Sequence, residues 1–124
     1  MRNFVLNIFI VLSPIILYAN EKIDFDYYFI DQTMRIDYFH IGDAEEEIFT
    51  IDHIYQQGIW AGNPDNLIDS FSNGRYFIKI YDIANNRLIF SKGYDSYFGE
   101  YKTTKPAKKG VKRAFHESAL IPYP

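Results

Sequence analysis

The chain has 124 residues, of which 13 are lysine or arginine, 16 are aspartate or glutamate and none is cysteine. This weak negative balance argues against nucleic acid and anionic membrane surfaces as partners. Without cysteine the chain has no disulfide bond, no cysteine-ligated zinc site and no lipid-bearing cysteine of a bacterial lipoprotein. Its aromatic content of 19% supplies apolar surface for a core that needs none of these supports.

The first nineteen residues have the organisation of a cleavable signal peptide. Arg2 precedes an apolar run at residues 4–17, and Ala19 supplies the small residue that a cleavage site requires. The run is shorter than the roughly 20 apolar residues that span a bilayer, which disfavours the alternative of an uncleaved anchor. We expect residues 1–19 to direct export to the periplasm, the cell surface or the medium. Residues 20–124 then form a single domain, with no membrane contact after cleavage.

Two alternating runs come next and predict a β-hairpin. In the first run, residues 33–41, the side chains of Met34, Ile36, Tyr38 and His40 fall on one face. The second run covers residues 47–56, and the turn between them is short and acidic. Successive strand residues point to opposite faces, so this pattern is typical of a sheet with one face on a core.

The next stretch differs in kind. Asn63 before Pro64 fits a helix N-cap followed by a first-turn proline, which predicts one short helical turn near residues 64–71. A second hairpin follows, with strands at 75–83 and 87–91 around Asn85 and Asn86, whose side chains tolerate positive φ.

The C-terminal third is mixed. Residues 93–104 are aromatic and rich in turn formers, residues 105–110 read as a flexible loop, and residues 111–121 alternate as a last strand. Five or six short strands separated by turns are typical of a sandwich or a barrel. The fold class we predict is all-β, an antiparallel β-sandwich.

A search for catalytic motifs finds no His-Glu-x-x-His, no glycine-rich phosphate loop and no nucleophile elbow. His40, His53 and His116 each lie on a predicted strand and in principle share a zinc ion, but their spacing gives this no support. Asp65 and Asp69 are residue types that ligate calcium, but roles in capping and turns explain them more simply. We predict no catalytic residue, no metal and no cofactor.

Aromatic residues give the one candidate interaction surface. Tyr94, Tyr97, Phe98 and Tyr101 are close in sequence, and aromatic platforms bind sugars and peptides. Trp60 is the further aromatic residue that we place with them. The alternative is that these rings fill the edge of the core.

Several stretches of the chain together resemble a known family. They are TMRIDY at 33–38, GIWAGN at 58–63, YDSYFGEY at 94–101 and FHESALIPYP at 115–124. In this series the chain resembles the N-terminal domain of IgA-peptidase-type secreted bacterial metallopeptidases (metallopeptidase family sixty-four). The resemblance covers nearly all of the expected mature chain, in order.

This resemblance implies a β-sandwich that precedes a zinc catalytic domain and holds none of the metal ligands. It also implies that the catalytic domain is absent from this sequence and is the natural partner, with a protein or glycoprotein substrate as a second one. We expect that domain to dock near Trp60 or near residues 94–101. The alternatives are a stand-alone exported module that binds carbohydrate or peptide, and a small hydrolase that uses the three histidines.

Overall fold

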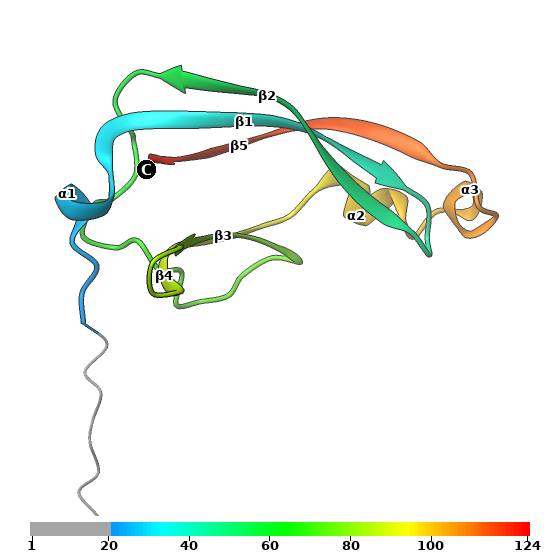
Figure 1. The fold of residues 1–124 in the computed structure, drawn as a ribbon. Helices are drawn as coiled ribbons and strands as arrows, with labels where there is room; N and C mark the ends of the chain where they lie inside the picture. Colours follow the sequence, from blue (N-terminus) through cyan, green and yellow to red (C-terminus); the bar gives the residue numbers. More distant parts are fainter. Residues whose placement is uncertain (1–20) are drawn as a thin grey trace, which may run out of the picture.

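The computed structural model describes residues 21–124, which fold into two antiparallel β-sheets with short helices at their ends (Figure 1). The predicted signal peptide, residues 1–19, lies outside the described residues. The elements in chain order are α1 (Phe25–Tyr28), β1 (Ile30–Gly42), β2 (Glu47–Gln57), β3 (Tyr76–Asp82), β4 (Arg87–Tyr94), α2 (Tyr97–Tyr101), α3 (Lys105–Lys108) and β5 (Arg113–Tyr123). One sheet has the order β2-β1-β5 and the other pairs β3 with β4. The predicted all-β antiparallel sandwich is confirmed.

The first predicted hairpin is formed by β1 and β2. Asp37 pairs with His53 and the next residue, Tyr38, pairs with Ile51, so Asp52 is the additional residue of a β-bulge on β2. Because of the bulge, the inward-facing side chains of β2 belong to odd-numbered residues before Asp52 and to even-numbered residues after it. β5 pairs with the other side of β1 and completes the sheet.

The turn between β1 and β2 depends on Gly42 and Asp43. Gly42 has φ +153, and a Cβ at this position would collide with the carbonyl oxygen of Glu46. The Asp43 carboxylate accepts hydrogen bonds from the backbone N–H groups of Glu45 at 2.8 Å and Glu46 at 2.9 Å. Lys112 Nζ lies 2.7 Å from the same carboxylate and ties the turn to the segment before β5.

The second predicted hairpin is formed by β3 and β4. Asn86 adopts φ 55 in the turn between them, which confirms the reason for expecting asparagine there. The Asn85 side chain accepts a hydrogen bond from the backbone N–H of Arg87 at 2.9 Å.

The predicted helical turn near residues 64–71 is wrong. Asn63 uses its side-chain oxygen to accept from the N–H of Asp65 at 2.9 Å, which makes a turn rather than a helix start. The backbone then runs extended, because Leu67 O accepts from Ser91 N at 2.9 Å and Asp69 N donates to Ser91 O at 3.2 Å. Backbone pairing with β4 therefore takes the place of helical hydrogen bonds.

Helices form instead at α2 and α3, in segments that the sequence indicated to be turns and a flexible loop. Ser96 caps α2, since its Oγ accepts from Phe98 N at 3.0 Å. Thr104 caps α3, with Pro106 in the first turn, and Ala107 is buried beneath it. Residues 105–110 are thus anchored to the domain.

Two hydrophobic clusters hold the layers together. The larger one joins both sheets and consists of Ile23, Phe29, Leu67, Ile89, Phe90 and Ile121. The smaller one lies under α2 and α3 and consists of Phe98, Tyr101 and Ala107, with Phe115 packed against it. Figure 1 shows α1 at one end of the domain and α2 and α3 at the other, so each end has its own cluster.

Candidate functional site

The aromatic surface that we expected at residues 94–101 is not formed. Phe98 is 0% exposed and Tyr101 is 5% exposed, whereas Tyr97 is 78% exposed and Tyr94 is half-buried. The reason is the helical turn of α2, which brings residues three apart onto one face. That face carries Phe98 and Tyr101 onto Phe115, with ring centroids 6.0 Å and 5.8 Å away.

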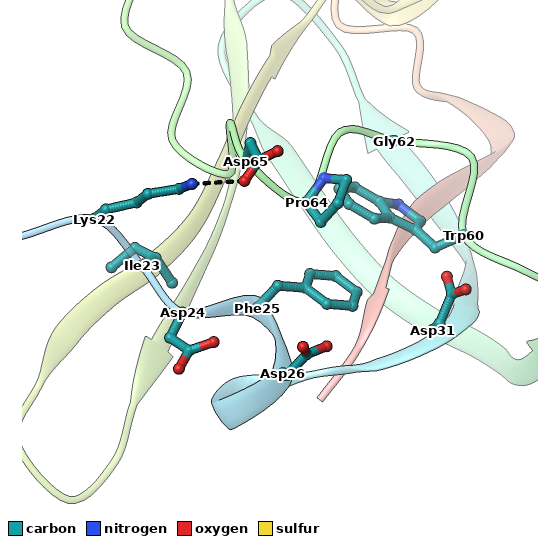
Figure 2. A pocket seen from close by; sticks show the side chains of 10 residues that line it. All are labelled: Lys22, Ile23, Asp24, Phe25, Asp26, Asp31, Trp60, Gly62, Pro64 and Asp65. Atoms are coloured by element: carbon teal, nitrogen blue, oxygen red, sulfur yellow. Dashed lines mark hydrogen bonds and ion pairs between the residues drawn. The ribbon is translucent and has the colours of Figure 1, made fainter.

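Trp60, the remaining member of the expected surface, lies at the opposite end beside a pocket. Its indole stacks on Phe25 of α1 with a centroid distance of 5.7 Å and an interplanar angle of 12° (Figure 2). The pocket has a volume of about 520 Å³. Its lining residues are Lys22, Ile23, Asp24, Phe25, Asp26, Asp31, Trp60, Gly62, Pro64 and Asp65.

Gly62 permits the stacked position of Trp60. A Cβ on Gly62 would overlap the six-membered part of the Trp60 ring, so a larger residue would push the ring off its place. The ring also contacts Phe90 of β4 edge-on at 6.0 Å. Trp60 is therefore held between the larger core cluster and the pocket, with one ring face against Phe25.

The pocket is acidic. Lys22 Nζ lies 2.6 Å from Asp65 Oδ1, at the left of Figure 2. Within residues 21–124, the carboxylates of Asp24, Asp26 and Asp31 have no hydrogen bond or ion pair. Carboxylates beside stacked aromatic rings suit a cation or a hydroxyl-rich ligand, and the lining has no nucleophile beside a base.

The three histidines do not meet. His40 points inward and has no exposed surface, whereas His53 and His116 lie on the outer face of the sheet and are 63% and 50% exposed. Both outer histidines pair with Asp52, at 2.9 Å and 3.2 Å. No group of three or more histidine, aspartate or glutamate side chains in residues 21–124 is placed to hold a metal ion.

His40 instead lies between two carboxylates in the middle of the domain. Its Nε2 is 2.9 Å from Glu47 Oε1 and its Nδ1 is 3.4 Å from Glu117 Oε2. Both Glu47 and Glu117 are mostly buried, with side chains 25% and 17% exposed. Phe49 and Phe98 stack on the two faces of the imidazole, each with a centroid distance of 4.1 Å.

The two carboxylates receive further hydrogen bonds from both sheets. Tyr38 OH donates to Glu117 at 2.9 Å, Lys102 Nζ donates to Glu47 at 3.0 Å, and Tyr76 OH also donates to Glu47. β1, β2, β3 and β5 all contribute, so this polar network joins the two layers. The sequence places His40 on the inward face but gives no sign that these glutamates approach it.

The pKa values in this network follow from burial and hydrogen bonding. Burial raises the pKa of Tyr38 and of Tyr76 well above the usual tyrosine value, and their hydrogen bonds to carboxylates raise it further. Burial also acts to raise the pKa of Glu47, but hydrogen bonds from Tyr76, Lys102 and His40 outweigh it and hold that pKa below its usual value. Glu47 is thus a stable anion.

Ser96, His40 and Glu47 are the residue types of a hydrolytic triad, but they are not arranged to act as one. Ser96 Oγ lies 3.3 Å from His40 Nδ1, yet it donates to Glu117 and accepts from Phe98 N. Since His40 has no exposed surface, a substrate cannot reach the imidazole. The network is a structural connection between the layers.

The side chain of Asp69, which we considered as a calcium ligand, binds backbone N–H groups instead. Its carboxylate accepts from the backbone N–H groups of Gly93 at 2.8 Å, Phe71 at 2.9 Å and Ser72 at 3.2 Å. These hydrogen bonds, that from Gly93 first, lower its pKa. Asp65 is paired with Lys22, as described above.

The fold is a small β-sandwich domain. The polar network around His40 is buried, and the pocket beside Trp60 lies at one end of the domain. The sequence matches the family described as Peptidase M64 N-terminus over residues 24–124, and the chain belongs to this family. The resemblance derived from the sequence motifs is thereby confirmed. A comparison with curated proteins finds no match. No helix within residues 21–124 is long and apolar enough to cross a membrane.

Proposed function

We propose that this chain is the non-catalytic N-terminal domain of an exported zinc metallopeptidase. The observation that carries the proposal is the family match, which covers residues 24–124. The chemistry of the described residues supports it, because His40 and its carboxylates are closed to substrate and the open pocket holds carboxylates without a nucleophile beside them.

The role proposed for the domain is to position the catalytic domain, to assist its folding, or to contact a protein or glycoprotein substrate. The end of the molecule near Trp60 is the surface that we assign to this contact. Tyr27, on α1 with Phe25, is 77% exposed, and Ile59, next to Trp60 in the sequence, is 74% exposed. Exposed apolar side chains around a pocket are typical of a docking surface between domains.

Sequencing the DNA downstream of codon 124 tests the proposal first. An in-frame His-Glu-x-x-His motif supports it, whereas a gene that ends cleanly beside an unrelated neighbour argues for a stand-alone protein. If the longer chain exists, it hydrolyses protein and the 124-residue chain does not. Ile59→Asp then lowers that activity at unchanged zinc content, while Ile83→Asp, at a residue that is 100% exposed on the β3–β4 turn, has no effect.

Export is tested by N-terminal sequencing of the protein recovered outside the cytoplasm. We expect the mature chain to begin at Asn20, without a lipid anchor, because the sequence has no cysteine to carry one. Recovery of the uncleaved chain in the membrane contradicts this part of the proposal.

A stand-alone carbohydrate- or peptide-binding module is the second candidate, and the pocket beside Trp60 is the observation that favours it. Trp60 is the one tryptophan of the sequence, so its fluorescence reports on the pocket. A saturable change on titration with an oligosaccharide or a basic peptide, lost when Asp31 is changed to Asn, supports the second candidate. If no oligosaccharide and no basic peptide changes the Trp60 fluorescence spectrum, the second candidate function is contradicted.

A further inference from the structure

Strand β2 is an edge strand with exposed apolar side chains. It lies at the outside of the sheet order β2-β1-β5, and among the described residues its only strand partner is β1 (Figure 1). Five apolar or aromatic side chains along it are between 42% and 64% exposed: Ile48, Phe49, Ile51, Ile54 and Tyr55. A long apolar edge presents unpaired N–H and C=O groups that pair readily with another strand.

The inward face of β2 is uncovered for most of its length. Ile51 and Ile54 face the side of the second sheet, since they pair with the inward residues Tyr38 and Ile36 of β1. They remain 64% and 54% exposed, whereas the contacts of β2 with Tyr76 of β3 are made by Phe49, at a ring-centroid distance of 6.2 Å, and by Glu47. β2 has no lysine or proline to discourage edge pairing, only the bulge at Asp52.

The sequence of β2 is complementary to itself in one antiparallel register. When Ile51 of one copy lies opposite Ile54 of a second copy, Asp52 lies opposite His53 and Thr50 lies opposite Tyr55. Because the bulge at Asp52 shifts the inward–outward alternation of β2 by one residue, this register pairs inward-facing residues with inward-facing ones and outward-facing residues with outward-facing ones. The apolar pair favours association, and the Asp52 carboxylate and the His53 imidazole are matched as hydrogen-bond partners across the interface.

We propose that β2 is a dimerisation edge, and that it pairs antiparallel with β2 of a second copy of this chain in the register that places Ile51 opposite Ile54. The twofold axis passes between the Asp52–His53 pairs and generates one continuous sheet across both copies. Because this axis is perpendicular to the sheet, the β3–β4 sheets of both copies lie on the same side of the sheet, and the interface is isologous. This inference does not depend on the proposed peptidase role.

Analytical ultracentrifugation of the protein over a concentration series tests the inference. We expect a reversible dimer that Ile51→Lys weakens by at least roughly tenfold, because each copy then places an ammonium group opposite Ile54. Ile83→Lys is the matched control, since Ile83 is fully exposed outside the interface, and it leaves the dimer unchanged. Circular dichroism and the melting temperature at low concentration confirm that both variants are folded.

Disulfide cross-linking tests the register. Because the sequence has no cysteine, only the introduced cysteines can form a disulfide. Chains carrying Asp52→Cys and chains carrying His53→Cys are mixed and oxidised, and we expect a disulfide between unlike chains. The same mixture with Ile83→Cys in place of His53→Cys gives none. A protein that stays monomeric at all concentrations, or a dimer that Ile51→Lys leaves intact, overturns the inference. If a further domain of a longer chain covers β2 instead, the longer protein is monomeric and its β2 amides are protected from exchange, which also overturns it.

Discussion

The Nε2 atom of His40 lies 2.9 Å from Oε1 of Glu47, in an interior where the His40 side chain has no exposed surface. The same imidazole approaches Glu117 of β5 at 3.4 Å. One side chain of the central strand β1 thus connects both neighbouring strands of its sheet. Through Tyr76, which donates to Glu47, it also connects to β3 in the second layer.

Changing His40 to Ala removes this connection. We expect the variant to lose about 3 kcal/mol of unfolding free energy, because two largely buried carboxylates lose a shared partner and two aromatic rings lose their contact. Urea unfolding followed by circular dichroism measures the loss. His116→Ala is the matched control, since His116 is 50% exposed, and it costs less than about 1 kcal/mol. Equal losses in the two variants contradict a structural role for the network.

The alternation of apolar and polar residues, together with the turn signal of Asn85 and Asn86, predicts the five strands of residues 21–124. Residues 33–41 and 47–56 become β1 and β2, and residues 111–121 become β5, with ends that differ by a few residues. Alternation works best for β1 and β5, because one face of each of these strands carries buried side chains, and alternating apolar and polar residues reflect that arrangement.

The helices and the polar network are not predictable in the same way. α2 and α3 have five and four residues, fewer than two turns, so no helical periodicity develops. Glu47 and Glu117 look like ordinary polar residues near a turn and on a strand. Only the register of β1 with its two neighbours places them beside His40, and register is a long-range property.

Acid stability depends on Asp43. Hydrogen bonds from Lys112 first, and then from the backbone of Glu46 and Glu45, lower the pKa of Asp43 to about 2 from an ordinary value of 3.8. Because the folded-state pKa is depressed, the contribution of this carboxylate is fully present above about pH 4. It is lost as the pH falls through about 2.

The measurement is the melting temperature of the wild type and of Asp43→Asn between pH 2 and pH 6. We expect the two curves to be separated at pH 5 and to converge toward pH 2, since a protonated Asp43 no longer attracts Lys112. A constant separation over the whole range means that Asp43 acts only as a turn acceptor and not through its charge.

Gly62 controls the position of Trp60. In Gly62→Ala the added Cβ meets the indole ring, so the ring must leave its stacked position on Phe25. We expect a red-shifted tryptophan emission and a stability loss of about 1–2 kcal/mol. Gly58→Ala serves as the control because a Cβ there meets nothing within 4 Å. Identical spectra for both variants and the wild type contradict the assignment of Gly62.

Neighbouring aromatic residues on α2 have opposite environments, which gives the sharpest test of the helix. Phe98 is fully buried among Tyr101, Phe115 and His40, while Tyr97 is 78% exposed. Phe98→Ala leaves a cavity beneath α2 and removes one face of the His40 stack, so we expect a loss of about 4 kcal/mol. Tyr97→Ala removes an exposed ring and changes stability by less than about 0.5 kcal/mol.

Urea unfolding of the two variants decides between the burial seen here and the exposed aromatic platform that the sequence alone suggested. If Phe98→Ala is as mild as Tyr97→Ala, α2 does not hold Phe98 in the core and residues 94–101 become available as a binding surface. If Phe98→Ala is severe and Tyr97→Ala is neutral, Phe98 belongs to the core and only Tyr97 and the half-buried Tyr94 of residues 94–101 present aromatic surface to a ligand. Recognition by a larger aromatic surface then falls to Trp60 and Phe25 at the other end.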